Sequence, residues 1–139
     1  MKKTILLVED NSDDVELTLE AFSGVNLLQI IVARDGVEAL ALLSSEMALP
    51  QLILLDLKLP KMSGLEILRQ VRTNPRTRRL PVVILTSSKE ESDLVSSYDL
   101  GVNSYVRKPV DFNEFTKAVS QLGLYWLLLN EMPSEPGAK

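Results

Sequence analysis

Four strand-like runs in this sequence each lead directly into a polar or charged side chain. The acidic pair Glu9-Asp10 follows ILLV, and Asp56 follows LILL. Thr86 follows VVIL, and Lys108 follows the short mixed run SYVR. Short, continuously apolar runs are typical of strands that are covered on both faces. Polar groups at several strand ends indicate one site that is assembled from several strands.

The charges at these positions suit a phosphoryl group. Three carboxylates within a few ångströms repel one another by about 4 kcal/mol per close pair at an effective dielectric constant of about 20. A hard divalent cation such as Mg²⁺ relieves this repulsion, and it prefers a few carboxylate oxygens with water and phosphate in its other positions. The ammonium of Lys108 can hold phosphoryl oxygens or orient Asp56. Because phosphoryl transfer depends mostly on positioning and charge neutralisation, we expect Asp56 to be phosphorylated.

The composition excludes several kinds of site. The chain of 139 residues contains neither histidine nor cysteine. It therefore cannot use a Ser-His-Asp triad or carry a phosphohistidine, so a phosphoryl group that arrives by that route must come from another protein. Without cysteine there are no disulfides or thiolate metal sites, which fits a cytoplasmic protein. The length predicts one domain.

Charge and hydropathy indicate a protein that binds neither nucleic acid nor membrane. The net charge of −4 argues against a nucleic-acid partner, which would favour a basic face. The arginines between residues 69 and 79 are interpreted as a solvated helix end and loop. No secretory signal is visible, and the apolar stretch 124–129 is too short to span a bilayer.

Strand-like runs alternate with helical patterns along the chain. The predicted strands are Thr4–Val8, Leu28–Ala33, Leu52–Asp56, Val82–Thr86 and Ser104–Arg107. Capping boxes, which satisfy free N–H groups at helix starts, are predicted at Asp35-x-x-Glu38, Ser63-x-x-Glu66, Ser88-x-x-Glu91 and Asp111-x-x-Glu114. The alternation predicts a doubly wound α/β domain with a five-stranded parallel sheet and five helices. Ligands in such domains lie beyond the carboxyl ends of the strands, where the polar side chains should meet. We expect residues 1–129 to form this domain, with an extended last helix, and residues 130–139 to form a flexible tail.

The ordered motifs resemble a known family. They are ILLVED, LILLDLKLP, Met62-Ser63-Gly64, VVILTSS and Tyr105 followed by Lys108-Pro109. Over residues 4 to 122 the chain resembles the CheY-like receiver domain of two-component response regulators. The resemblance implies the flavodoxin-like fold with strand order 2-1-3-4-5, and a single-domain response regulator that serves a phosphorelay.

The same resemblance implies roles at the acidic site. Asp56 would accept a phosphoryl group from the phosphohistidine of a sensor histidine kinase. Asp10 and Asp56 would bind Mg²⁺ together with the backbone carbonyl of Lys58, and Glu9 would act through a water molecule. The side chain of Lys58 lies where this family tunes hydrolysis of the acyl phosphate.

Further implied roles concern the switch. Lys108 would contact the phosphoryl oxygens, and the Lys108–Pro109 peptide bond is expected to be cis. Thr86 would hydrogen-bond the phosphoryl group and draw Tyr105 inward. This would shift the population between two conformers, so that signalling proceeds through altered binding of a partner or of a second copy.

The end of the chain predicts an interaction surface. The segment YWLLLNEMP resembles the ends of receivers that serve bacterial phytochrome histidine kinases and form homodimers. The residues predicted at the homodimer interface are Leu124, Tyr125, Trp126, Leu127 and Leu128. The alternative is an extended helix that folds back on its own domain.

Two other functions remain open from the sequence. One is a phosphorylation-independent adaptor that keeps only the fold. The other is a phosphohydrolase with Asp56 as its nucleophile, although such enzymes often have a second Asp where this chain has Lys58. We favour a phosphoacceptor signalling domain that is not an enzyme.

Overall fold

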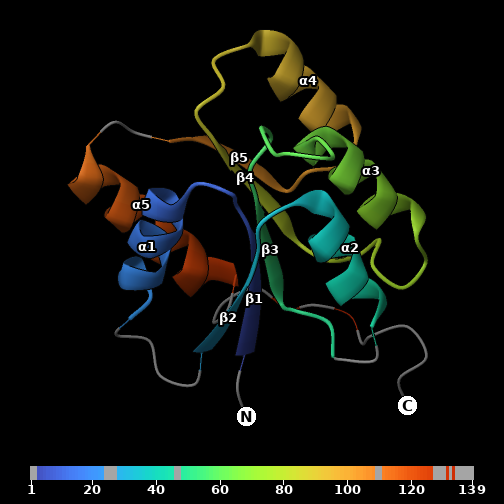
Figure 1. Ribbon diagram of the computed structural model, residues 1–139, viewed down its shortest axis with the longest axis horizontal. Helices are drawn as coiled ribbons and strands as arrows, with labels where there is room; N and C mark the ends of the chain where they lie inside the picture. The colour runs from blue at the N-terminus through green and yellow to red at the C-terminus, as the bar shows by residue number, and fades with distance from the viewer. Residues whose placement is uncertain are drawn as a thin grey trace.

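The computed structural model describes residues 3–23, 28–45, 48–108 and 111–126, together with residues 131 and 133 (Figure 1). Its strands are β1 (Lys3–Val8), β2 (Leu28–Ala33), β3 (Leu52–Leu55), β4 (Val82–Thr86) and β5 (Ser104–Arg107). Its helices are α1 (Ser12–Ala21), α2 (Gly36–Ser44), α3 (Gly64–Thr73), α4 (Glu91–Asp99) and α5 (Phe112–Leu124). None of the helices in these ranges has the length and apolar composition that a membrane span requires.

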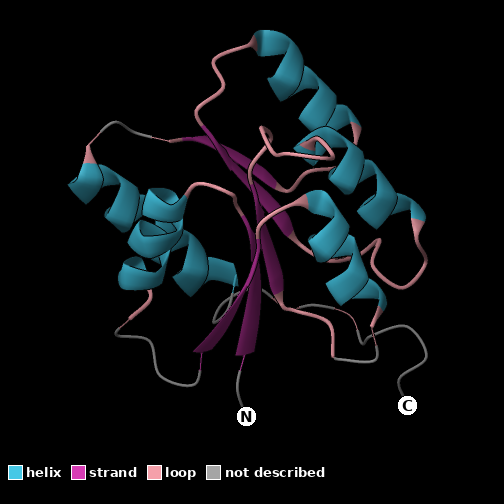
Figure 2. Ribbon diagram, viewed as in Figure 1, coloured by secondary structure: helices cyan, strands magenta, loops and turns pink. Residues whose placement is uncertain are grey.

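The strands form one parallel sheet in the order β2-β1-β3-β4-β5, which confirms the predicted fold class. Helices α1 and α5 cover one face of the sheet, and α2 and α3 cover the other, with α4 beside α3 (Figures 1 and 2). Because β1 pairs with both β2 and β3, the strand order reverses at β1. A ligand site is therefore expected where the ends of β1 and β3 lie side by side.

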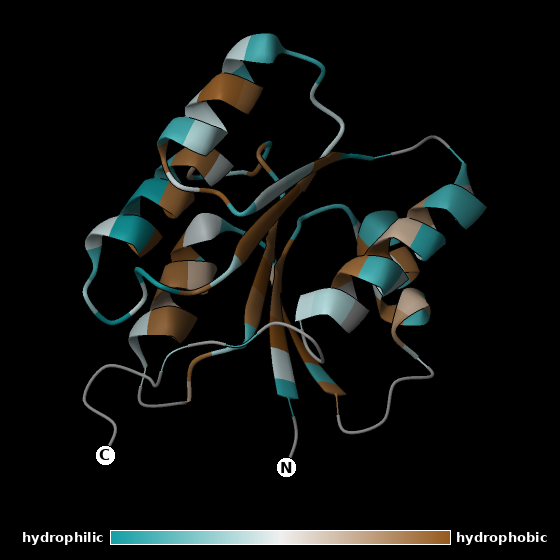
Figure 3. Cartoon of the chain, turned by 180° about the vertical axis from the view of Figure 1, so that it is seen from behind, coloured by the Kyte–Doolittle hydropathy of each residue, from teal (hydrophilic) through white to brown (hydrophobic). Residues whose placement is uncertain are grey.

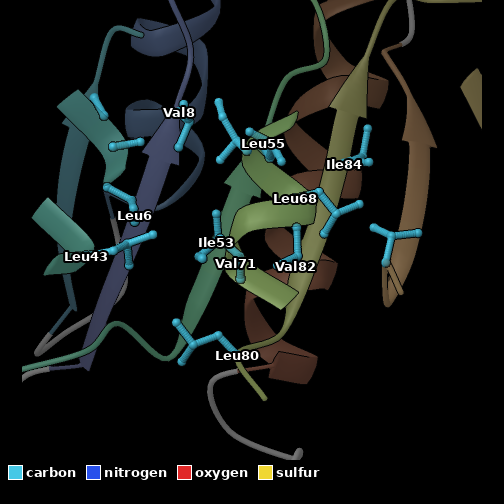
Figure 4. Packing of buried hydrophobic residues seen from close by; sticks show 14 of the residues in the cluster. Leu6, Val8, Leu43, Ile53, Leu55, Leu68, Val71, Leu80, Val82 and Ile84 are labelled. Atoms are coloured by element: carbon cyan, nitrogen blue, oxygen red, sulfur yellow. The ribbon is translucent and has the colours of Figure 1, made fainter. Parts of the chain in front are cut away.

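Alternate residues of each central strand pack on opposite faces of the sheet, as the period of two requires. In β3, Ile53 and Leu55 join the cluster under α2 and α3, which Figure 4 shows. Leu52 and Leu54 join the cluster under α1 and α5. All four side chains are buried. The strands at the centre of the sheet are correspondingly coloured as hydrophobic over much of their length in Figure 3. The buried strand leads directly into Asp56, which therefore lies at the carboxyl edge of the sheet.

The N-cap hydrogen bond of the predicted capping boxes forms at three of the four helices. Asp35, Ser63 and Asp111 each accept a hydrogen bond from the backbone N–H three residues later. The prediction for Ser88 is wrong, because α4 begins later, with Glu90 as its N-cap. Ser88 is buried, and its hydroxyl donates to Asp93 at 2.6 Å.

Arg72 also differs from the expectation of a solvated arginine cluster. Its guanidinium is partly buried, and burial lowers the pKa of Arg72. Nε donates to the Gly101 carbonyl at 2.8 Å, and the terminal nitrogens donate to the Leu80 carbonyl at 2.8 Å and to Asn103 Oδ1 at 2.9 Å. Arg72 therefore ties the end of α3 to the loops that precede β4 and β5.

Several predicted features lie outside the described residues. These are the Lys108–Pro109 peptide bond, Leu127, Leu128, the side chain of Leu124, and the boundary between the domain at 1–129 and the tail at 130–139.

Gly64 allows α3 to approach the segment that follows β3. A Cβ atom at Gly64 would lie 2.2 Å from the carbonyl oxygen of Asp56 and 2.6 Å from the Cα of Leu57. Both neighbours are backbone, so they cannot move aside as a flexible side chain can. We expect Gly64→Ala to lower the free energy of unfolding by about 1–3 kcal/mol, measured by urea denaturation. Unchanged stability would mean that the backbone beside Asp56 yields more easily than this packing implies.

Candidate functional site

The acidic residues meet at the carboxyl ends of β1 and β3. Val8 and Leu55 are aligned in the parallel ladder, and the Asp56 N–H donates to the Val8 carbonyl at 3.1 Å. The following residues, Glu9, Asp10 and Asp56, each offer a carboxylate oxygen within 4.8 Å of the others. Glu9 and Asp56 are buried, whereas Asp10 is exposed. The cluster is therefore open to solvent on the side of Asp10.

The Asp56 carboxylate is held by the backbone that follows it. Its Oδ1 atom accepts hydrogen bonds from the N–H of Leu57 at 2.8 Å and from the N–H of Lys58 at 3.5 Å. Its Oδ2 atom lies 3.5 Å from the ammonium nitrogen of Lys108. One carboxylate oxygen is therefore fixed by backbone N–H groups, and the other faces a positive charge.

Lys108 contacts three carboxylates. Its Nζ lies 2.5 Å from Glu9 Oε1, 2.7 Å from Asp14 Oδ2 and 3.5 Å from Asp56 Oδ2. The main-chain N–H of Lys108 donates to the Thr86 carbonyl at 2.7 Å, which fixes the end of β5 against β4. Sequence reasoning missed Asp14, because it lies inside α1 and no strand end marks it.

The electrostatics of the cluster perturb two groups. Burial raises the pKa of Glu9 to about 7, and the charge of Asp56 adds to this, while the hydrogen bond from Lys108 acts in the opposite direction. Burial alone would lower the pKa of Lys108, but Asp14, Glu9 and Asp56 together outweigh it, so this pKa is raised. Lys108 thus remains charged and compensates acids that would otherwise repel one another.

Residues 5–120 match the family described as the response regulator receiver domain. The chain belongs to this family. It is a receiver domain, and its function is that of a response regulator in a phosphorelay, as the sequence predicted.

The receiver is similar to several characterised proteins. It is 38% identical to the response regulator Rcp1 of Synechocystis sp., over 95% of this chain and 94% of Rcp1. The solved structure of the phosphorylated cyanobacterial phytochrome response regulator RcpA matches with a TM-score of 0.92 at 38% identity, over 96% of this chain and 100% of RcpA. The bacteriophytochrome response regulator RtBRR matches with a TM-score of 0.73 at 53% identity, over 96% of this chain and 85% of RtBRR.

The acid cluster of the receiver fits a divalent metal ion. Carboxylate oxygens are the ligands that hard divalent cations prefer, and three of them converge here around one open side. A solved structure of Rcp1, with a TM-score of 0.89 at 38% identity over 95% of this chain and 99% of that chain, is bound to Mn²⁺. Receiver domains bind divalent metal, and Glu9, Asp10 and Asp56 are placed to hold one in this chain.

Thr86 lies at the end of β4, beside the end of β3. It is fully buried, and its hydroxyl oxygen accepts a hydrogen bond from the N–H of Ser88 at 3.2 Å. The Ser88 hydroxyl in turn donates to Asp93 in α4 at 2.6 Å. A continuous set of hydrogen bonds therefore joins the threonine to the first turn of α4.

The hydroxyl of Tyr105 is buried and makes no hydrogen bond within the described ranges. The ring is partly buried and packs against the cluster under α2 and α3. Burial raises the pKa of Tyr105, and the Ser88 hydroxyl offsets part of the shift from nearby, although it lies outside hydrogen-bonding geometry with the tyrosine hydroxyl.

Removing this hydroxyl should stabilise the receiver. We expect Tyr105→Phe to raise the free energy of unfolding by about 1 kcal/mol, because a buried polar group without a partner loses its hydration on folding. Urea denaturation measures the change, and Tyr98→Phe, at an exposed ring of α4, is the matched control. A loss of stability in Tyr105→Phe but not in the control would show that the hydroxyl has a partner.

Other predicted residues are placed as follows. Lys58 is exposed at the rim of the site.

Trp126 packs against the cluster under α1 and α5, whereas Tyr125 is half exposed and meets the Trp126 ring edge-on at 5.0 Å. A groove of about 400 Å³ lies here between β5 and α5, lined by Ser104, Val106, Ala118, Gln121, Leu122, Tyr125 and Trp126. The described start of the predicted interface thus contributes both to the domain core and to an open groove.

Proposed function

We propose that Asp56 is the phosphoacceptor of this receiver. The phosphorus–nitrogen bond of a kinase phosphohistidine would break as a carboxylate oxygen of Asp56 forms a bond to phosphorus, giving an acyl phosphate and a free imidazole. The observation that supports this most directly is the buried carboxylate beside two further acids and one ammonium. Lys108 would move from its acid partners to the phosphoryl oxygens, and Thr86 would donate its hydroxyl to them.

Mg²⁺ is the metal proposed for this site. Asp10, Asp56 and the backbone carbonyl of Lys58 would bind it, and Glu9 would act through a water molecule. The bound ion would neutralise charge on the phosphoryl oxygens. Its size and preference for oxygen ligands suit a cluster that leaves positions for water and phosphate.

The proposed kinase is a sensor histidine kinase of the phytochrome type, in the cytoplasm. The names of RcpA and RtBRR, which describe phytochrome and bacteriophytochrome response regulators, support this partner. The receiver itself would signal without acting as an enzyme on other substrates. Phosphorylation would shift Tyr105 and the β4–α4 segment between two conformers.

We also propose that the chain forms a homodimer through residues 124–128. The groove between β5 and α5 and the half-exposed Tyr125 support an apolar contact at this end of the chain. Sedimentation of the protein should give a dimer at micromolar concentration, and Tyr125→Ser should weaken it. A monomer at high micromolar concentration would contradict the proposal.

Intact-mass measurement after incubation with acetyl phosphate and Mg²⁺ tests the phosphoacceptor. One slowly lost phosphate adduct on the wild-type protein, absent in Asp56→Asn, is the expected result. Rapid release of phosphate with no adduct would favour a phosphohydrolase, and no adduct without turnover would favour a phosphorylation-independent adaptor. Asp13→Asn, which neutralises an exposed acid of α1, is the matched control and should retain the adduct.

A further inference from the structure

Asp14 is a fourth acid at the site, and its position is independent of the strand ends. Its Oδ2 accepts a hydrogen bond from Lys108 Nζ at 2.7 Å, across 94 residues of sequence. Lys108 therefore lies closer to Asp14 than to Asp56, whose Oδ2 is 3.5 Å away. The ammonium is held towards Glu9 and Asp14, at the end of β1 and in α1, rather than towards Asp56.

The first turns of α1 keep the backbone of Asp14 in place. The Asp14 N–H donates to the side chain of Asn11 at 3.0 Å, and the Asp14 carbonyl accepts from the Thr18 hydroxyl at 2.8 Å. Val15 and Thr18 are buried, so α1 is anchored on the sheet at this point. The Asp14 carboxylate is consequently tethered to a fixed element and would not travel with a phosphoryl group on Asp56.

The donors of the ammonium are limited in number. Lys108 has three N–H groups, and Glu9 and Asp14 take two of them at short distances. One N–H group is left for the phosphoryl oxygens on Asp56, so a second contact to them would require one of these two hydrogen bonds to be exchanged. Every acceptor that holds Lys108 elsewhere therefore weakens its interaction with the phosphoryl group.

We propose that Asp14 is a positioning residue that competes with the phosphoryl group of Asp56 for the Lys108 ammonium. The inference rests on the proposed phosphorylation of Asp56. Asp14, in α1, thereby disfavours the phosphorylated state. The receiver forms this state less readily than it would if only the acids that follow β1 and β3 contacted Lys108. Asp14 does not contact the reacting atoms and acts through Lys108.

The alternative role for Asp14 predicts the opposite result. If Asp14 oriented Lys108 towards Asp56, removing its charge would misplace the ammonium and weaken phosphoryl binding. Under competition, removing its charge releases the ammonium and strengthens that binding. Since the Asp14 side chain is 27% exposed, the pair is screened by solvent, and we expect a change of about fivefold.

Titration with beryllium fluoride at saturating Mg²⁺ tests the proposal, because BeF₃⁻ on a carboxylate reproduces the shape and charge of a phosphoryl group. Binding is followed by ¹⁹F NMR of the bound fluorides. We expect Asp14→Asn to bind BeF₃⁻ about fivefold more tightly than wild type, with an unchanged melting temperature. Asp14→Glu, which keeps the charge, should return the affinity towards wild type.

Asp13→Asn is the matched control for general electrostatics. Asp13 is an exposed acid in the same turn of α1, so its neutralisation removes the same charge without removing a contact to Lys108. Mg²⁺ affinity, measured separately by calorimetry without fluoride, ensures that all variants are compared at metal saturation.

The outcomes separate this inference from the proposed function. Unchanged or weaker BeF₃⁻ binding by Asp14→Asn, or equal tightening by Asp13→Asn, would overturn the competitive role of Asp14 while leaving Asp56 as phosphoacceptor. Failure of the wild-type protein to bind BeF₃⁻ would overturn both.

Discussion

Replacing Lys108 with methionine should destabilise the metal-free receiver by about 3–5 kcal/mol. Methionine keeps most of the side-chain volume but leaves Glu9, Asp14 and Asp56 without the cation that they share. A buried ion pair that loses one partner leaves a buried charge uncompensated, which costs more than the pair itself contributes. Urea denaturation at pH 8 with a chelator present measures the change in free energy of unfolding.

The control is Lys117→Met, which removes an exposed lysine of α5 and should change the stability by less than about 0.5 kcal/mol. Mg²⁺ should restore part of the stability lost in Lys108→Met, because a divalent cation that binds the folded state compensates the same acids. If both lysine variants lost equal stability, hydration of the three carboxylates would be sufficient to screen their mutual repulsion. The cluster would then be less desolvated than its burial implies.

The sheet and the main site residues could be predicted because their signals are local. The run LILL must be covered on both faces, so it predicts a central strand that ends at Asp56. The rule that parallel strands present their carboxyl ends at one edge then brings Glu9, Asp56 and Thr86 together. The resemblance to receivers supplied the strand order, which periodicity alone does not determine.

Other contacts could not be predicted because they depend on how the elements pack. Asp14 has the position of an ordinary acid in the first turn of a helix, and only the packing of α1 next to α5 on one face of the sheet brings it to Lys108. Arg72 reads as one charge among several, yet the loops before β4 and β5 enclose it. Ser88 has the spacing of a capping box, but its burial directs the hydroxyl to Asp93. Sequence spacing shows which contacts are within reach, and tertiary packing decides which of them form.

The titration of Glu9 should make the metal-free receiver less stable as the pH rises. Burial raises the pKa of Glu9 from its usual 4.5 to about 7 in the folded state. Between these values the folded state binds more protons than the unfolded state, so the free energy of unfolding falls with increasing pH. The difference corresponds to about 3 kcal/mol, lost between about pH 4.5 and pH 7 and constant at higher pH.

This pH window is favourable for the measurement because the chain has no histidine. The lowered pKa values of Asp35 and Glu66 affect stability only at more acidic pH, where their carboxylates become protonated and their contribution is lost. Urea denaturation at intervals from pH 5 to pH 8, with a chelator present, should therefore report mainly on Glu9.

Glu9→Gln provides the decisive comparison for this titration. Glutamine is close in shape to the protonated acid, so the variant should show a nearly flat profile over this range and exceed the wild-type stability at pH 8. Mg²⁺ should reduce the wild-type slope, because a cation bound beside Glu9 favours its charged form and lowers the pKa. A flat wild-type profile without metal would instead mean that Lys108 compensates Glu9 fully, and that burial does not hold this carboxyl in its neutral form.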